Sequence, residues 1–403
     1  MADAPYWDPW DYALHADPHP TWRRLREEAP LYYNEAHDFW VLSRFQDVLD
    51  ALVDSKTYSS AKGDIIEVIR GGELPESTRS LISEDPPVHT VHRHMLSRSF
   101  TPRAVKQIED RVRVFTRQVL EEQRGTDGFD FVDDLGARVP GMVIAAMLGT
   151  PDSDIDRLRH LADAQLHLDP DNPLDRSRYN ETAIQIGEYF LEHARARRQD
   201  PRDDLMSALM TMEFTDEHGV TRELHEMEAV SYIKLLSNAG NETTARFAGW
   251  AGAVLARFPD ERAKLVARPE LIPNAVEEIL RFEPPAMALA RVVTEDVVWY
   301  DQGVPAGSVV VLLNAATGRD QRQFDDPDSF RVEREIERHL SFGFGAHVCM
   351  GASLARLEGR IIIEEMLARF PEWDVAWDET QIVHTGSAVR GYSKLPITFG
   401  RAG

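Results

Sequence analysis

The stretch Phe342-Gly-Phe-Gly-Ala-His-Val-Cys-Met-Gly351 decides the fold of this chain, because it holds Cys349, the single cysteine in 403 residues. A lone cysteine is most often a small buried apolar residue, and the thiol alone leaves that interpretation open. The glycines around it permit unusual backbone angles and close approach by another group. A helix-forming run, Ala-Ser-Leu-Ala-Arg-Leu-Glu, follows Gly351, so the sulfur lies just before a helix N-terminus, which stabilises a thiolate.

A thiolate on a glycine-rich loop suggests a metal ligand, and haem is one candidate for the group that carries the metal. One cysteine excludes an intramolecular disulfide, a zinc ribbon and an all-cysteine iron–sulfur cluster. The formal net charge of −23 argues against nucleic acid and anionic membrane surfaces as partners. The N-terminus lacks a signal-peptide pattern, and no apolar run approaches the ~18 residues of a membrane span, so we expect a soluble, cytoplasmic protein.

The order of predicted elements is that of one helix-rich domain over residues 1–403 with a smaller β portion. Apolar residues make up 43% of the chain, which is enough for one large core. Strands are expected mainly in residues 30–60, 292–315 and 373–400, where apolar runs are bounded by turn residues. Residues 224–258 contain no proline and predict a helix about 50 Å long.

Two segments between the predicted elements are candidates for the walls of a pocket. Residues 59–84 form an irregular run, and we favour a lid or pocket wall over disorder, because a loop this long inside a domain is usually functional. Residues 167–174, His-Leu-Asp-Pro-Asp-Asn-Pro-Leu, are a second candidate for a mobile lid.

Three polar patterns have both a structural and a functional interpretation. His89 and Arg93 are four residues apart on one helical face, and form either a solvated surface or a cationic pair aimed at a carboxylate. Residues 239–244, Ala-Gly-Asn-Glu-Thr-Thr, place a glycine that costs about 1 kcal/mol in the long helix, which indicates a local kink or a functional site. Glu278 and Arg281 are three residues apart, and on spacing alone predict a surface ion pair of little worth.

Together these patterns resemble a cytochrome P-450, a haem-thiolate monooxygenase of the soluble bacterial kind, over nearly the whole chain. The strongest motif is Phe-x-x-Gly-x-His-x-Cys-x-Gly, which is met by Phe342, Gly345, His347, Cys349 and Gly351. By this resemblance Phe342, Gly345 and Gly351 of the motif, together with Ala239, would contact the cofactor. The resemblance implies a mainly α cytochrome P-450 fold with a large helix-rich part and a smaller β-rich part. It also implies haem b (iron protoporphyrin IX) as cofactor, with the Cys349 thiolate as the iron ligand.

Haem carries two propionates, which need cations or hydrogen-bond donors when they are buried. By similarity this role falls to four residues: His89, Arg93, Arg291 and His347. Glu278 and Arg281 match the family's buried structural ion pair behind the haem, the loss of which should cost several kcal/mol. The chain departs from the family at the usual third partner of this pair, where it has Ser329, so that Arg331 and Arg334 are both candidates for that place.

Within the long helix, Ala239-Gly240-x-Glu242-Thr243 resembles the oxygen-binding groove of the family. By this resemblance, Gly240 would leave room for dioxygen over the iron. Thr243 would hydrogen-bond to the activated dioxygen, while Glu242 would relay protons from solvent, since an acid–alcohol pair is a physical means of proton delivery.

The pocket above the haem would be closed, by analogy with the family, by the two loop segments, residues 59–84 and 162–174, and by side chains that are mostly small and apolar. These side chains are Leu236, Ala286, Met287, Leu289 and Val389. Such walls predict an apolar small molecule as substrate, which would be hydroxylated or epoxidised with dioxygen and two electrons. Two alternatives are a peroxide-driven peroxygenase on the same fold and a haem protein that binds a ligand without turnover.

The chain is too short for a fused reductase and carries no flavin or iron–sulfur motif, so electrons are expected from a ferredoxin and an NAD(P)H-dependent ferredoxin reductase. Most small ferredoxins are acidic, as is this chain, and docking would therefore need a local basic patch on the cysteine side. The candidates for the patch are Arg98, Arg103, Lys106, Arg356 and Arg360. We expect a monomer without nucleic-acid or membrane partners.

Overall fold

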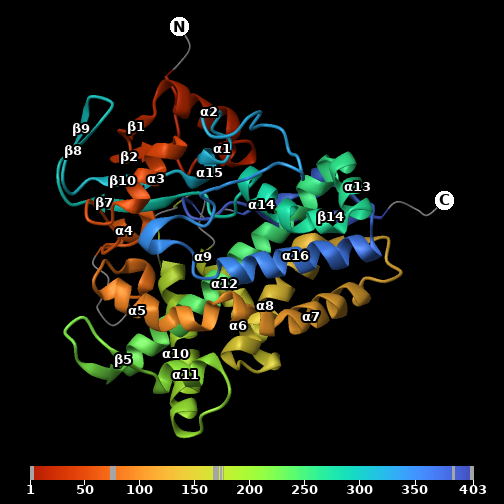
Figure 1. Cartoon of the computed structure of the whole chain (residues 1–403), viewed down its shortest axis with the longest axis horizontal. Coiled ribbons are helices and arrows are strands. Elements are labelled where there is room, and N and C mark those ends of the chain that lie inside the picture. The colour runs from red at the N-terminus through yellow and green to blue at the C-terminus, as the bar shows by residue number, and fades with distance from the viewer. Residues whose placement is uncertain are drawn as a thin grey trace.

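Helices dominate the computed structural model, which describes residues 4–72, 79–166, 172, 175, 177–383 and 386–399 (Figure 1). The predicted mainly α architecture with a smaller β part is confirmed. The α-helices are α1 (Tyr12–Ala16), α2 (His19–Glu28), α3 (Phe45–Val53), α4 (Ile66–Arg70), α5 (Val88–Ser97), α6 (Pro102–Gln107), α7 (Glu109–Glu122), α8 (Arg138–Leu148), α9 (Ile155–Leu166), α10 (Ser177–Gln199), α11 (Leu205–Thr211), α12 (Glu226–Arg257), α13 (Pro259–Ala267), α14 (Ile272–Phe282), α15 (Asn314–Thr317) and α16 (Ala352–Arg369).

The strands form several small sheets, of which the largest joins the N-terminal region to residues 289–312. Its strand order is β1-β2-β10-β7-β3, and β2 and β10 run parallel whereas the other neighbours are antiparallel. Figure 1 shows this sheet at one side of the molecule, beside the helical part. The strands are β1 (Leu31–Asn34), β2 (Phe39–Leu42), β3 (Tyr58–Ser59), β4 (Gly128–Asp130), β5 (Glu213–Thr215), β6 (Thr221–Glu223), β7 (Leu289–Val293), β8 (Val297–Trp299), β9 (Gln302–Val304), β10 (Val309–Leu312), β11 (Asp374–Val375), β12 (Gln381–Ile382), β13 (Tyr392–Lys394) and β14 (Pro396–Thr398).

The longest of the described helices, α12, has 32 residues and packs against α8, α10, α14 and α16. At 1.5 Å per residue it is about 48 Å long, close to the predicted length. It stays helical through Gly240, so this glycine does not break it. Its second half, from Asn241 onward, carries mostly buried side chains, because neighbouring helices cover it on several sides. None of the helices in the described part of the chain is long and apolar enough to cross a membrane.

Glu278 and Arg281 of α14 form a fully buried ion pair. The buried pair implied by the family resemblance is therefore confirmed, and the surface pair predicted from spacing alone is wrong. Arg281 donates from Nε and Nη2 to the two Glu278 oxygens at 2.6 and 2.7 Å, and from Nη1 to the Gly318 carbonyl at 2.6 Å. The third partner is Arg334, whose Nε lies 3.1 Å from Glu278 Oε1. Arg331 contributes its backbone N–H at 2.9 Å, while its side chain lies toward Asp325.

Several short elements lie where no regular element was expected. The irregular run of residues 59–84 contains the short helix α4, and residues 199–223 contain α11 and the β5–β6 hairpin. The strand β4 pairs with the C-terminal strand β14 and so could not be recognised from local sequence. Parts of the two predicted lids, residues 73–78 and residues 167–171 with 173 and 174, lie outside the described residues.

Candidate active site

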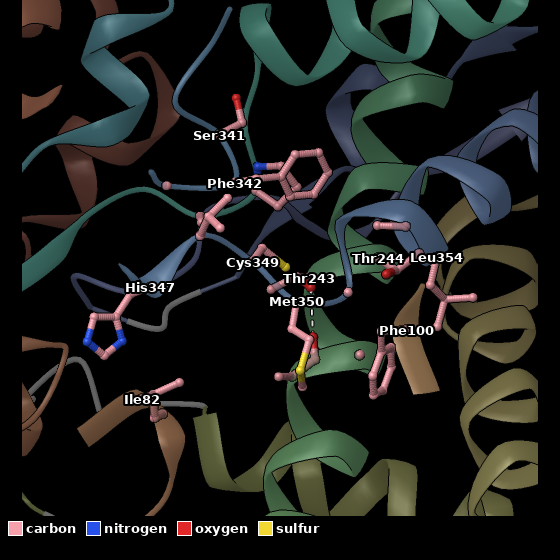
Figure 2. Close-up of a pocket in the computed structure, with 18 of the residues that line it drawn as sticks. Ile82, Phe100, Thr243, Thr244, Ser341, Phe342, His347, Cys349, Met350 and Leu354 are labelled. Atoms are coloured by element: carbon pink, nitrogen blue, oxygen red, sulfur yellow. Dashed lines mark hydrogen bonds between the residues drawn. The ribbon is translucent and has the colours of Figure 1, made fainter. Parts of the chain in front are cut away.

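A cavity of about 280 Å³ brings together the cysteine loop and the polar segment of α12 (Figure 2). Cys349 and Thr243, which are more than a hundred residues apart in sequence, line it together. The cavity wall contains these predicted site residues: His89, Arg93, Leu236, Ala239, Gly240, Thr243, Ala286, Leu289, Phe342, His347, Cys349 and Gly351. The structure therefore places both predicted faces of the site against one cavity.

The cysteine loop holds the Cys349 sulfur at the start of α16. The Cys349 N–H donates to the Phe342 carbonyl at 2.8 Å, which closes the loop on itself. The backbone N–H groups of Gly351 and Ala352 donate to the sulfur, as we expect for a helix N-terminus. These bonds favour the thiolate, but although Cys349 is exposed to the cavity, desolvation by the surrounding protein has the larger effect and raises the pKa of its thiol. A metal cation would reverse this balance, because coordination deprotonates a thiol.

Gly345 has a different role from the one predicted, because it packs against protein rather than against the cavity. Its φ is +70°, in the left-handed region that favours glycine. A Cβ atom there would lie 2.5 Å from the carbonyl oxygen of Leu52 in α3. Gly345 thus lets the cysteine loop approach the N-terminal part of the chain, and supports the site indirectly.

Four basic side chains from three parts of the chain form a cluster, and three of them, His89, Arg93 and His347, line the cavity. His89 and Arg93 come from α5 and Arg291 from β7, while His347 belongs to the single 3-10 turn Gly345–His347 of the cysteine loop. The rings of His89 and His347 are 4.1 Å apart between centroids. Arg291 does not line the cavity but is buried near His347, and its Nη1 donates to the Ala290 carbonyl at 2.8 Å.

This cluster is electrostatically unfavourable by itself. Burial, followed by the charges of Arg291, His89 and Arg93, lowers the pKa of His347 to about 3. Burial and then Arg93 lower the pKa of His89. Both ring nitrogens of His89 and Nε2 of His347 are buried without a hydrogen-bond partner among the described residues. Such groups are costly unless an acceptor reaches them, so the cluster is suited to an anion with several oxygen atoms.

On α12, Gly240 and Thr243 face the cavity. The Thr243 hydroxyl donates to the Ala239 carbonyl at 2.8 Å, within the helix. A Cβ at Gly240 would lie 2.8 Å from Cδ1 of Ile144 in α8. Glycine at this position therefore also serves the packing of α8 on α12, in addition to the predicted role of leaving room in the cavity.

Glu242 lies beside this segment but does not line the cavity, and it is 3% exposed. Arg246 Nε donates to Glu242 Oε1 at 2.7 Å, and Arg246 Nη1 donates to the Tyr392 carbonyl at 2.6 Å. Glu242 also shares a hydrogen bond with Asp163 of α9. Burial raises the pKa of Glu242 to about 7; Arg246 opposes this shift and Asp163 adds to it.

Comparison with known proteins identifies the family. A family model described as Cytochrome P450 matches residues 263–385. The putative cytochrome P450 123 of Mycobacterium tuberculosis is 38% identical over 392 residues, which cover 97% of this chain and 96% of the relative. This chain belongs to the cytochrome P450 family. It is accordingly a haem monooxygenase, in which a cysteine thiolate binds the haem iron.

Two further P450 proteins show how far the similarity extends. The vitamin D(3) 25-hydroxylase of Pseudonocardia autotrophica is 34% identical to this chain, and the aligned region covers 95% of this chain and 94% of the relative. The crystal structure of CYP109E1 from Bacillus megaterium in complex with testosterone matches with a TM-score of 0.87 and 29% identity, over 95% of this chain and 98% of that one. The P450 fold predicted from sequence is thus confirmed along nearly the whole chain.

The residues present fit a P450 haem. The unpartnered nitrogens of His89 and His347 and the charges of Arg93 and Arg291 provide the donors that two propionates need. Cys349, with two N–H groups on its sulfur, would provide the thiolate that binds the iron. We therefore propose that these five residues hold the cofactor.

The predicted substrate wall is partly corrected by the structure. Leu236, Ala286 and Leu289 line the cavity. Met287 instead packs in a separate core cluster with Trp7 and Trp22, because alternate residues of an extended segment point to opposite sides. Val389 forms a β-bridge to Ala286 behind the wall. Ala162 lies in a small separate cavity between α8, α9 and α12.

Phe100 and Glu358 are among the cavity residues that the sequence interpretation did not identify. Phe100 enters the cavity from the turn after α5 (Figure 2), and no local pattern marks it. Glu358 of α16 lines the cavity on the Cys349 side and is 1% exposed, with Oε2 unpartnered among the described residues. Burial raises the pKa of Glu358 to about 8, so it is held as the neutral acid at neutral pH. A signal for Glu358 existed, because it follows Leu354 at i+4 on the face of α16 predicted to be buried.

Proposed function

We propose that this P450 inserts one oxygen atom from O2 into an apolar small molecule, by hydroxylation or epoxidation, with electrons from a ferredoxin and its reductase. The observation that carries the proposal is the shared cavity, in which a cysteine with N–H donors on its sulfur lies opposite a glycine and a threonine of α12. When bound, haem supplies the iron at which dioxygen is activated. The chain supplies the charges, protons and walls around it.

The protein groups have separate tasks in this proposal. The N–H groups of Gly351 and Ala352 hold negative charge on the Cys349 sulfur and tune its donor strength. The Thr243 hydroxyl lies at the cavity wall and donates a hydrogen bond to the Ala239 carbonyl. It can instead donate this hydrogen bond to dioxygen bound in the cavity. Glu242, next to it in sequence, titrates near neutral pH and can return a proton to the hydroxyl side of the helix.

The walls support an apolar substrate. Beyond the polar groups assigned to the cofactor, the cavity is lined by side chains that offer no charge: Leu81, Ile82, Phe100, Leu235, Leu236, Ala286, Leu289 and Leu354. Burial of such walls against a ligand is favourable in proportion to the apolar area covered. One relative is named a hydroxylase of vitamin D(3), and one solved neighbour holds testosterone, which are both large apolar molecules.

The surface near the cysteine loop supports a smaller basic patch than the one predicted. Arg356 is paired with Glu277 at 2.7 Å, and Arg360 with Glu109 at 2.7 Å, so neither carries free charge. The remaining candidates, Arg98, Arg103 and Lys106, are exposed, and no ion pair is recorded for them within the described part of the chain. We propose that these three cations, at the end of α5 and in α6, meet an acidic ferredoxin.

The first experiment compares turnover of an apolar library, with testosterone and vitamin D3 included, under two regimes. Ferredoxin, reductase, NADPH and O2 should give oxygenated product, whereas hydrogen peroxide alone should give little. Product with peroxide but none with ferredoxin would establish the peroxygenase alternative. No product under either regime, with tight binding of a ligand, would establish a binding protein.

A charge-reversal experiment tests the electron donor. Arg98→Glu with Arg103→Glu should lower the rate of reduction by ferredoxin and reduce its dependence on salt, because opposite charges steer association. Arg178→Glu is a matched control, since Arg178 is an exposed residue of α10, which packs on α9, α11 and α12. Equal reduction rates in all three proteins would contradict the docking proposal.

A further inference from the structure

A second carboxyl group lies next to Glu242, and the proposed reaction does not yet use it. Asp163 of α9 hydrogen-bonds to Glu242 of α12. The two side chains differ in burial, since that of Glu242 is 4% exposed and that of Asp163 is 38% exposed. Arg246 contacts both carboxyl groups. Its Nη2 is 4.0 Å from Asp163 Oδ1, and its Nε is 2.7 Å from Glu242 Oε1. The arrangement leads from the interior of α12 to the surface of α9.

Chemistry assigns different roles to these three groups. A hydrogen bond between two carboxyl groups requires that one of them carry a proton, because two carboxylates offer no donor and repel each other. Arg246 cannot supply that proton, since a guanidinium stays protonated in proteins. It is also fixed in place by its bond to the Tyr392 carbonyl. Of these two partners of Glu242, only Asp163 can both exchange a proton and reach solvent, since its side chain is partly exposed.

We propose that Asp163 is the solvent-side member of a two-carboxyl relay that reloads Glu242 with protons. When Glu242 has given its proton toward the Thr243 side, the Asp163 carboxylate takes up a proton from solvent and passes it to the Glu242 carboxylate, so that one proton enters for each one used. Asp163 is a positioning residue, because it acts through Glu242. The inference rests on the proposed monooxygenase reaction, in which protons are consumed.

The neighbouring charges are consistent with exchange at Asp163. Arg159 of α9 has Nη1 3.8 Å from Asp163 Oδ2, and Nη1 is also 3.3 Å from Asp133 Oδ1. Arg246 and Glu242 face Asp163 from α12. Asp163 thus stands between two guanidinium groups, while burial favours the protonated form of Glu242 on the inner side. In the proposed relay the proton is held at Glu242 and replaced through Asp163.

The first arm of the test reads the carboxyl groups and not the activity. Infrared titration of the holoenzyme should show a protonated carboxyl band that disappears in Glu242→Gln, which assigns it to Glu242. In Asp163→Asn the same band should titrate at lower pH, because the neighbouring carboxylate that raises the pKa of Glu242 is gone. The matched control is Asp156→Asn, since Asp156 also lies on α9 near Arg159 and its side chain is 82% exposed. An unchanged titration in Asp163→Asn would overturn the proposal.

The second arm follows proton use during turnover, with ferredoxin, reductase, NADPH and whichever of testosterone and vitamin D3 shifts the Soret band. Asp163→Asn should lower kcat on the order of 10-fold, less than the roughly 10²-fold or greater loss of a direct proton donor. It should also raise the solvent isotope effect on kcat and leave KM unchanged, which a packing defect would not do. Asp163→Glu, which restores a carboxyl, should recover most of the rate, and Asp156→Asn should equal the parent protein.

The outcomes distinguish a failure of the proposed monooxygenase function from a failure of the Asp163 relay. If the parent protein gives no oxygenated product, the proposed function fails, and the infrared arm still tests the coupling of the two carboxyl groups. If the parent is active and Glu242→Gln is impaired while Asp163→Asn matches the parent in both arms, the relay through Asp163 is wrong. Impairment of Asp163→Asn that Asp163→Glu does not repair would show a structural role instead, and would also overturn it.

Discussion

The buried group formed by Glu278, Arg281 and Arg334 gives a quantitative prediction about stability. Glu278→Gln leaves two buried guanidinium groups without their carboxylate, and we expect a loss of about 3–5 kcal/mol in the free energy of unfolding. Arg334→Met should cost less, about 1.5–3 kcal/mol, because Arg281 still neutralises Glu278 through two bonds. Arg331→Ala should stay within about 0.5 kcal/mol, since Arg331 offers Glu278 only its backbone N–H.

Urea unfolding followed by far-ultraviolet circular dichroism measures these differences from the shift in midpoint at constant slope. The order of the three variants is the critical result, because it separates the two arginines that sequence left as alternatives. Reasoning from the pair geometry would be refuted if Arg331→Ala destabilised the protein as much as Arg334→Met. It would also be refuted if the free energy of unfolding of Glu278→Gln differed from that of the parent protein by less than about 1 kcal/mol.

Three further predictions concern the cavity. Cys349→Ser should abolish the characteristic absorption of the reduced carbon monoxide complex, measured by difference spectroscopy, because no second cysteine exists to replace the ligand; retention of that band would contradict the ligand assignment. Thr243→Ala should divert NADPH consumption from product to hydrogen peroxide, measured by a peroxide assay, and unchanged coupling would count against its role in proton delivery. Glu358 has a pKa raised to about 8 in the folded protein, so the native state binds the extra proton and stability must fall as the pH rises from about 4.5 to 8. Glu358→Gln should remove this slope, at most about 1.4 kcal/mol per pH unit, in urea midpoints measured across that range; parallel curves for both proteins would refute the shift.

Patterns that lie close together in sequence were predicted well. The glycine-rich loop before a helix placed Cys349 with helix-start donors, and the proline-free run predicted α12 within a few residues. The spacing of His89 and Arg93 put both on the cavity side of α5. These features depend on helix periodicity and on the φ angles that glycine permits, which are local properties of the chain.

Features that depend on distant partners were not predicted. Asp163 and Glu242 meet only because α9 packs on α12, and nothing near either residue indicates the other. Gly345 was assigned to the cofactor, but its neighbour is Leu52, which comes from the opposite end of the chain. Met287 was assigned to the wall because its segment was apolar, whereas its side was decided by a core cluster that contains N-terminal tryptophans. Packing, not local preference, decided each of these cases.

The parallel pairing of β2 with β10 has a consequence for biosynthesis. Val310 is the register partner of Trp40, so the β1–β2 hairpin emerges from the ribosome without its neighbour and waits for 270 further residues. At the usual speed of translation this delay is about 15 to 50 s. During that time the edge of β2 is open to other chains, which makes misassembly a hazard of synthesis rather than of the finished protein. Arg291, on β7 beside β10, reaches its place only when this sheet closes. Arg291 thus reaches its position late, and the yield of folded protein from cells should rise with a lower growth temperature and with added chaperones more than with stabilising substitutions on the helical side.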